Sequence, residues 1–129
     1  MTNTVQGTFT VDVKPLTPAP AEGLSRFSIN KTIVGDLEGT TKGEMFSGGN
    51  PKQSSAGYVA IEVFTGALAG KQGTFSLQHF ATMEPTGRKM TVMVVPGSGT
   101  GALKGIEGTF TIDIKDGQHF YSLSYTLPD

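Results

Sequence analysis

"GTFTVDVK", residues 7–14, is repeated almost unchanged as "GTFTIDIK" at residues 108–115, and "GTFSLQHF" at residues 73–80 is a partial third copy. In the first two copies apolar and polar residues alternate after the glycine. Alternation with a period of two predicts a β-strand that turns one face toward a core and the other toward solvent. The three copies therefore predict equivalent strands of one curved sheet.

The same alternation recurs along the whole chain, and turn residues separate the runs. Asp116-Gly117 suits a two-residue hairpin turn, and "PTGR" (85–88) places Pro and Gly as a tight turn requires. No segment is suited to a long crossover helix, so neighbouring strands should pair antiparallel as a meander. The eight predicted strands are 5–14, 25–34, 38–47, 56–66, 73–84, 88–96, 108–115 and 118–127.

Two of the copies lie within a longer module, "LAGKQGTF" (68–75) and "LKGIEGTF" (103–110). We interpret each as a strand end, a glycine-bearing turn and a new strand whose Phe faces the core. Because Phe9 and Phe110 carry the same pattern near the two chain ends, we expect the first and last strands to meet. The 129 residues then form one domain, a closed eight-stranded antiparallel meander barrel in which no long sheet edge is exposed.

Composition excludes several function classes. The net charge is −1, and 16% of the residues are charged, without the basic cluster that nucleic-acid binding requires. The chain lacks cysteine, so it has no disulfide framework and no thiolate chemistry. There is neither a recognisable signal peptide nor an apolar run of about 20 residues that could span a membrane. We expect a cytoplasmic protein that binds neither nucleic acid nor membrane and needs no cofactor.

Four stretches resemble a small bacterial family, the domain-of-unknown-function family number 3224. They are "GDLEGTTKGEM" (35–45), "SAGYVAIEVFTGALAGKQGTFSLQH" (55–79), "VVPGSGTGALKGIEGTFTIDI" (94–114) and "DGQHFYSLSYTLP" (116–128). The resemblance covers nearly the whole chain in order. It implies an eight-stranded antiparallel barrel similar to that of allene oxide cyclase, with a lipocalin-like architecture. It implies no particular activity, because the family has none established.

Candidate site residues are those that interrupt the apolar faces. Glu62 shares a face with Tyr58, and His79 shares one with Phe75. If both faces point into the barrel, burial and mutual charge would tune Glu62 and His79 as an acid/base pair. The structural alternative is a solvated Glu62 on the exterior and a hydrogen-bonded packing role for His79. The residues that we predict to bind a ligand are Tyr58, Glu44, Phe75, Tyr121 and Tyr125; the facing of Glu44 is ambiguous.

Other motifs point away from common chemistries. "GSGTGA" (97–102) has the form of a dinucleotide fingerprint, but "ALKGIEG" after it leaves no room for the helix that would hold a pyrophosphate. Ser98 has no nucleophile-elbow context. The two histidines lie far apart in sequence without a ligand-type spacing, so we expect no metal site.

These patterns favour a binding module that holds a small apolar or amphipathic molecule in the barrel lumen. The alternative, which rests on the resemblance to the allene oxide cyclase barrel, is a cyclase or isomerase that acts on an oxygenated or polyunsaturated molecule through Glu62 or His79. A third hypothesis is self-association through apolar outer faces of the predicted strands 56–66 and 88–96, so a homo-oligomer is also an expectation.

Overall fold

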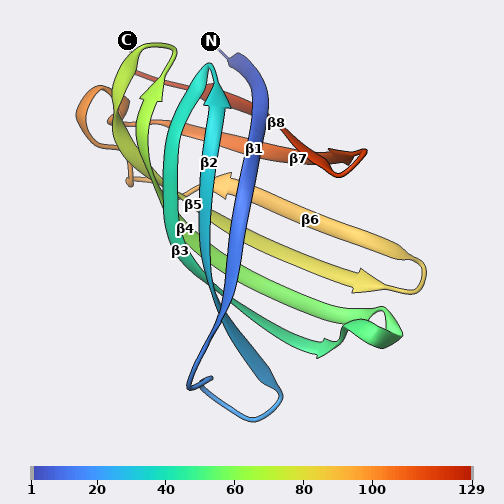
Figure 1. Ribbon diagram of the computed structural model, residues 1–129. Coiled ribbons are helices and arrows are strands. Elements are labelled where there is room, and N and C mark those ends of the chain that lie inside the picture. Colours follow the sequence, from blue (N-terminus) through green and yellow to red (C-terminus); the bar gives the residue numbers. More distant parts are fainter. Residues whose placement is uncertain (1, 129) are drawn as a thin grey trace.

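The computed structural model describes residues 2–128 and forms a closed antiparallel barrel (Figure 1). The strands pair in chain order, and β1 also pairs with β8, with Val5 opposite Leu123. The predicted closure by the first and last strands is therefore confirmed. The eight strands are β1 (Asn3–Leu16), β2 (Leu24–Gly35), β3 (Leu37–Asn50), β4 (Ser55–Leu68), β5 (Lys71–Glu84), β6 (Gly87–Val94), β7 (Glu107–Lys115) and β8 (Gln118–Thr126).

The repeated Gly-Thr-Phe motif marks close approaches between neighbouring segments. At each of its three glycines, a Cβ atom would lie 2.2–2.3 Å from a main-chain oxygen of the adjacent segment, which no larger residue could tolerate. Two residues later, each Phe enters the barrel interior and is almost completely buried. The motif therefore lets the sheet bend tightly at the point where it begins to fill the core. The residues are Gly7, Gly73 and Gly108, followed by Phe9, Phe75 and Phe110.

One end of the barrel is filled by an apolar cluster, which we call the plug. Its side chains come from all eight strands, with only the first residue of β3 contributing, and from the connection between β6 and β7. In this connection the single turn η2 (Gly101–Leu103) and Ile106 cover the end of the barrel. Thr100 fastens this connection, because its main-chain N–H donates to the carbonyl of Thr74 over 2.9 Å. The members on which later sections depend are Phe9, Leu37, Phe64, Leu68, Phe75, Leu103, Phe110, Tyr121 and Tyr125.

The barrel wall has one weak seam, between β6 and β7. These strands are paired only at Met93 and Thr109, whereas β7 pairs with β8 along its whole length. Figure 1 shows the β5–β6 and β7–β8 hairpins diverging from this point. The barrel is therefore closed at the plug and split beside its other end.

That other end, which we call the mouth, is not filled. Val11 and Val13 lie on the same face of β1 as buried Phe9, yet they are 37% and 43% exposed. The predicted face of β1 is thus correct, but at this end of the barrel no core side chains cover that face. Among residues 2–128, no helix has the length and apolar character needed to cross a membrane.

Candidate functional site

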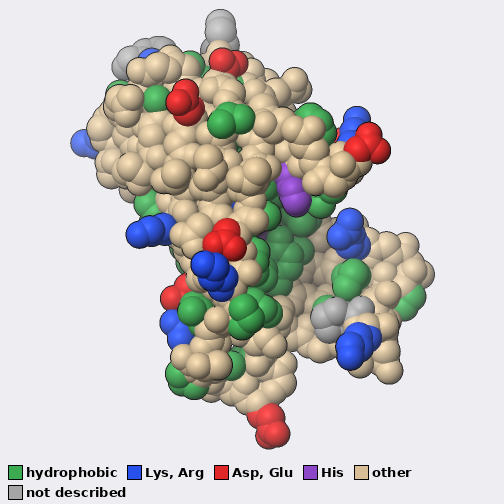
Figure 2. Space-filling view, in the orientation of Figure 1, with side chains coloured by type: hydrophobic (Ala, Val, Ile, Leu, Met, Phe, Trp, Pro, Cys, Tyr) green, Lys and Arg blue, Asp and Glu red, His purple; other side chains and the backbone are tan. Residues whose placement is uncertain are grey.

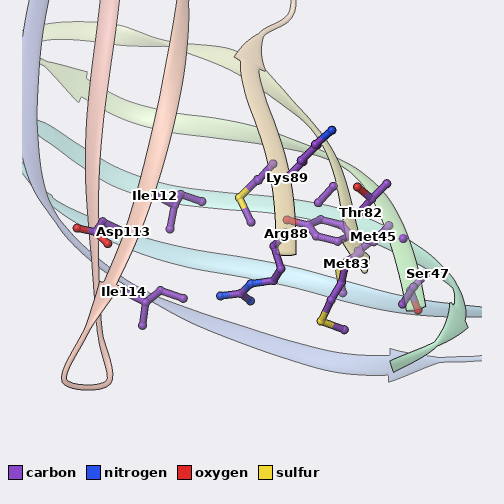
Figure 3. Close-up of a pocket in the computed structure, with 14 residues that line it drawn as sticks. Met45, Ser47, Thr82, Met83, Arg88, Lys89, Ile112, Asp113 and Ile114 are labelled. Carbon is purple, nitrogen blue, oxygen red and sulfur yellow. The ribbon is translucent and has the colours of Figure 1, made fainter. Parts of the chain in front are cut away.

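A pocket of about 450 Å³ occupies the mouth. Figure 2 shows hydrophobic side chains lining a hollow between the β7–β8 and β5–β6 hairpins, and Figure 3 shows the lining residues. The lining is mostly apolar, with three methionines, and Tyr58, Ser47 and Arg88 add polar groups. A concave, mostly apolar surface with a few polar groups is typical of small-molecule sites. The main apolar contributors are Met45, Ala81, Met83, Met90, Ile112 and Ile114.

A layer of buried charge lies between the mouth and the plug. Lys31 Nζ donates to Glu62 Oε2 over 2.7 Å, and the same oxygen accepts a hydrogen bond from the imidazole of His79. The side chain of Glu62 is 0% exposed, and those of Lys31 and His79 are each 4% exposed. Buried charges are rare in proteins unless they are paired, as they are here.

Strand register explains how these three side chains meet. Glu62 on β4 is diagonal to His79 on β5, since His79 lies opposite Ala60. Lys31 approaches from β2 across β3, where Gly43 lies opposite Glu62. A Cβ atom on Gly43 would lie 2.7 Å from Cβ of Glu62, so only glycine leaves room for the acidic side chain. The ammonium of Lys31 also faces the rings of Phe9 and Phe110.

Glu62 is a carboxylate at neutral pH. Burial raises its pKa, but the hydrogen bond from His79 and the positive charge of Lys31 outweigh burial and lower the pKa to about 2. Its second oxygen, Oε1, is fully buried and has no hydrogen-bond partner within residues 2–128. Because it stays ionised, Glu62 is suited to holding a neighbouring group and unsuited to donating a proton.

The carboxylate fixes the proton position on His79. A carboxylate only accepts hydrogen bonds, so Nε2 of His79 must carry the hydrogen, and in the neutral ring Nδ1 has the free lone pair. Among the described residues, the hydrogen bond of the imidazole is made through Nε2. The neighbours of His79 toward the mouth are Tyr58 and Ala81, which both line the pocket.

Tyr58 connects the buried layer to the pocket. Its ring lies beside the imidazole of His79, with centroids 6.3 Å apart. Burial and the charge of Glu62 raise the pKa of Tyr58, and the charge of Arg88 partly offsets them. The phenol therefore stays protonated at neutral pH and can donate a hydrogen bond into the pocket.

The candidate residues from the sequence separate into three groups. Glu62, His79 and Tyr58 come together beneath the mouth. The structure excludes Glu44 from the lumen: it faces outward and binds Arg26 on the exterior, with Nε of Arg26 2.7 Å from its Oε1. Glu44 stands between the inward-facing Gly43 and Met45, so the alternation of β3 turns it away from the pocket.

The other three predicted ligand-binding residues belong to the plug. Phe75 is fully buried and packs against Phe64, with ring centroids 5.0 Å apart. Tyr121 stacks on Phe110, and its hydroxyl donates to main-chain carbonyl oxygens. Tyr125 is 7% exposed within the same cluster. All three face inward as predicted, but they lie too deep to line the mouth.

Sequence reasoning missed Lys31 and Arg88. Lys31 interrupts the apolar face of Ile29 and Ile33, which is the same signal that identified Glu62. Arg88 alternates with Met90 and Val92, and the alternation places it on the inner face at the mouth. Both could have been found by applying the alternation rule to basic residues as well as acidic ones.

Two further expectations concern metals and self-association. Within residues 2–128, no three His, Cys, Asp or Glu side chains gather in a way that could hold a metal ion. On the outside, Val59, Ile61 and Val63 of β4 and Phe80 of β5 are each at least 46% exposed. The exposed apolar stripe thus covers β4 and β5, whereas we expected it on the predicted strands 56–66 and 88–96. Self-association through this stripe stays a prediction.

The fold and site define a small β-barrel with one filled end and one open, ligand-sized end. A family model described as a protein of unknown function, DUF3224, matches residues 5–125, and the chain belongs to this family. A crystal structure of a DUF3224 protein of unknown function from Shewanella oneidensis MR-1 is similar over 100% of this chain and 99% of its own. The sequence identity is 41% and the TM-score is 0.92. A search of curated proteins gave no match.

Proposed function

We propose that the protein binds a small, largely apolar molecule in the mouth of the barrel. The observation that carries the proposal is the pocket of about 450 Å³, which is open to solvent and lined mainly by methionine, isoleucine and alanine side chains. Pockets of about 300–1,000 Å³ with such a lining bind small ligands. Methionine adapts its shape and makes favourable contacts with aromatic rings, which suits a flat or irregular apolar guest.

A neutral aromatic probe, 2-naphthamide, tests the proposal directly. The wild type should bind the probe, as measured by calorimetry or by the probe's fluorescence. Ala81→Phe should abolish binding, because Ala81 lines the pocket and a larger ring would fill it. Gln78→Phe, on the exposed face of the same strand, is the matched control and should bind normally. Equal binding by both variants would overturn the proposal, as would a wild type that binds neither this probe nor its charged analogues of similar size.

Native mass spectrometry provides a second measurement. Protein purified from its own host should retain a molecule small enough for the pocket, and the same spectrum reports the number of subunits. Ala81→Phe should lose that molecule and Gln78→Phe should keep it. Retention by both variants would place the molecule elsewhere and count against the mouth.

A second candidate function is proton transfer on the bound molecule, as a cyclase or isomerase would require. The observation that favours it is the Glu62–His79 pair, in which the carboxylate engages Nε2 and leaves the lone pair of Nδ1 free in a neutral ring beside Tyr58 of the pocket lining. A base oriented by a third group is the usual arrangement for proton abstraction in enzymes. Nδ1 would take a proton from a carbon beside a carbonyl; the electron pair of the broken C–H bond would form the C=C bond of the enolate, and the π pair of the carbonyl would move to its oxygen.

Deuterium exchange distinguishes catalysis from binding alone. 2-Tetralone, a ketone of naphthalene size, should exchange its α-hydrogens in D₂O faster with the wild type than in buffer. His79→Gln should remove the acceleration, with a loss of about 100-fold or more if His79 is the base. A ketone that binds without accelerated exchange would leave binding as the function and reject the catalytic candidate.

A further inference from the structure

The charges around the mouth do not balance. Arg88, Lys89 and Asp113 are the charged residues of the pocket lining. Asp113 already has a partner, because Lys115 Nζ lies 3.5 Å from its Oδ2. Within residues 2–128, neither Arg88 nor Lys89 forms an ion pair. The pocket therefore has an excess of positive charge that no side chain of the described chain neutralises.

The deeper carboxylate does not serve as the missing partner. Glu62 is fully buried and is engaged by Lys31 at 2.7 Å and by His79. It lies one layer below the pocket lining and forms no ion pair with Arg88. The charges within this buried layer offset one another. The unpaired cation above it therefore gives the pocket a positive electrostatic potential.

The side chain of Arg88 is positioned to bind a charged group of a ligand in the pocket, whereas that of Lys89 is not. The two residues are adjacent on β6, so their side chains leave opposite faces of the strand. Figure 3 shows the guanidinium of Arg88 extending into the pocket near Met83 and Ile114, while the chain of Lys89 extends away from these residues. The charge of Arg88 is also felt at Tyr58, where it lowers the pKa that burial raises.

A guanidinium in such surroundings favours one kind of chemical group. It has five donors in a planar fork that matches the two oxygens of a carboxylate or the oxygens of a phosphate. The apolar side chains of Met83, Met90 and Ile114 lie in the same lining and offer a surface to the apolar part of such a ligand. The protonated phenol of Tyr58 is a further donor on the same pocket surface.

We propose that the molecule in the mouth has an anionic head group, a carboxylate or a phosphate monoester, which Arg88 binds while the apolar body contacts Met83 and Met90. This inference rests on the proposed binding function and names the chemical class of its ligand. The ligand is thus an amphipathic anion, with its charge at Arg88 on the seam side of the mouth and its apolar part against the methionine side chains of the lining.

Four naphthalene probes of similar size and different charge test the inference by titration calorimetry: 2-naphthoate, 2-naphthyl phosphate, neutral 2-naphthamide and cationic 2-naphthylmethylamine. At low salt, at least one anion should bind about tenfold more tightly than the amide, and the amine should bind most weakly. Comparison of the two anions identifies the head group as carboxylate or phosphate. Raising the salt concentration should reduce the preference for the anion and leave amide binding nearly unchanged.

Variants assign the effect to one side chain. Arg88→Gln should remove the preference for the anion over the amide, and Arg88→Lys should retain part of this preference. Lys89→Gln removes the same charge from the next residue and should change anion binding less than threefold. Because Arg88 is exposed and forms no ion pair within residues 2–128, its substitution should not alter urea unfolding.

The possible outcomes distinguish this inference from the proposed binding function on which it rests. If the amide binds but neither anion binds more tightly, the head-group assignment is wrong and the binding function stands. If Arg88→Gln and Lys89→Gln weaken anion binding equally, the effect is general surface charge and the assignment to Arg88 is wrong. If none of the four probes binds, the proposed function fails, and this inference fails with it.

Discussion

The two ends of the barrel use the same strands and the same alternation but reach opposite results. At the plug, phenylalanine and leucine side chains meet across the lumen, and a connection containing Leu103 and Ile106 covers them. At the mouth, the inward faces have methionine, valine and isoleucine, several of which stay exposed, as Met90 does at 48%. Between them, paired charges occupy the lumen. The side chains that form the core and the pocket that we propose for a ligand are therefore separated along one axis.

The largest expected effect comes from the plug. Phe75→Ala should lower the free energy of unfolding by about 3–5 kcal/mol, because Phe75 is fully buried against Phe64 and alanine would leave a cavity. Phe80→Ala on the same strand is the control: Phe80 is 61% exposed, so its loss should cost about 0.5 kcal/mol or less. Urea unfolding of both variants checks this. Similar losses would mean that the plug is not the source of stability.

The buried charges should give the next effect. Lys31→Met should destabilise the protein by about 3 kcal/mol at neutral pH, since it leaves the carboxylate of Glu62 buried without its cation. Lys42→Met, on the exposed face of β3, removes an equal charge and should be nearly neutral. Unfolding curves in urea measure both. A neutral result for Lys31→Met would show that His79 alone suffices to hold the carboxylate.

Acid should remove the contribution of Glu62. Its pKa falls from an ordinary value of 4.5 to about 2 in the folded protein, so the stabilisation is complete above about pH 4.5 and is lost as the pH falls toward 2. The loss across this window should approach about 3 kcal/mol. Glu62→Gln should be less stable at pH 7 and should lack this part of the decline. Parallel pH profiles for the two proteins would contradict the assignment.

The smallest stability effect should come from the mouth. Met90→Ala should cost less than about 1 kcal/mol in unfolding, because nearly half of its surface is already exposed. The same change should weaken 2-naphthamide binding about fivefold, which corresponds to about 1 kcal/mol. Calorimetry and urea unfolding of one sample measure both quantities. A large stability loss with unchanged binding would reverse the roles that we assign to the two ends.

The sequence predicted which face each residue occupies better than how deep it lies. Alternation grouped Glu62 with Tyr58 and His79 with Phe75, but it left open whether the face of Glu62 points into the barrel, and the structure shows that it does. Alternation could not place Tyr121 in the plug and Tyr58 at the mouth, because depth depends on strand tilt and on the stagger between strands, which no single strand reveals. Glu44 was ambiguous because β3 has little apolar alternation, and its outward facing is evident only from the register that brings it to Arg26.

The strand boundaries show a similar limit. The first predicted strand, 5–14, is longer in the structure, where β1 continues to Leu16 because β2 pairs with it that far. The strand predicted at 88–96 ends at Val94, where the chain turns to cover the plug. Pairing partners therefore decided where strands end, and a local pattern has no information about partners.

The pairing of β6 with β7 at Met93 and Thr109 alone has a mechanical consequence. The barrel is closed by topology, but its sheet is joined between β6 and β7 by this one residue pair. Opening this single pairing would let the two flanking hairpins move apart without breaking any other ladder bond. If the mouth binds a molecule as we propose, its opening can fit guests of different shape, and charge and apolar surface would decide which of them bind.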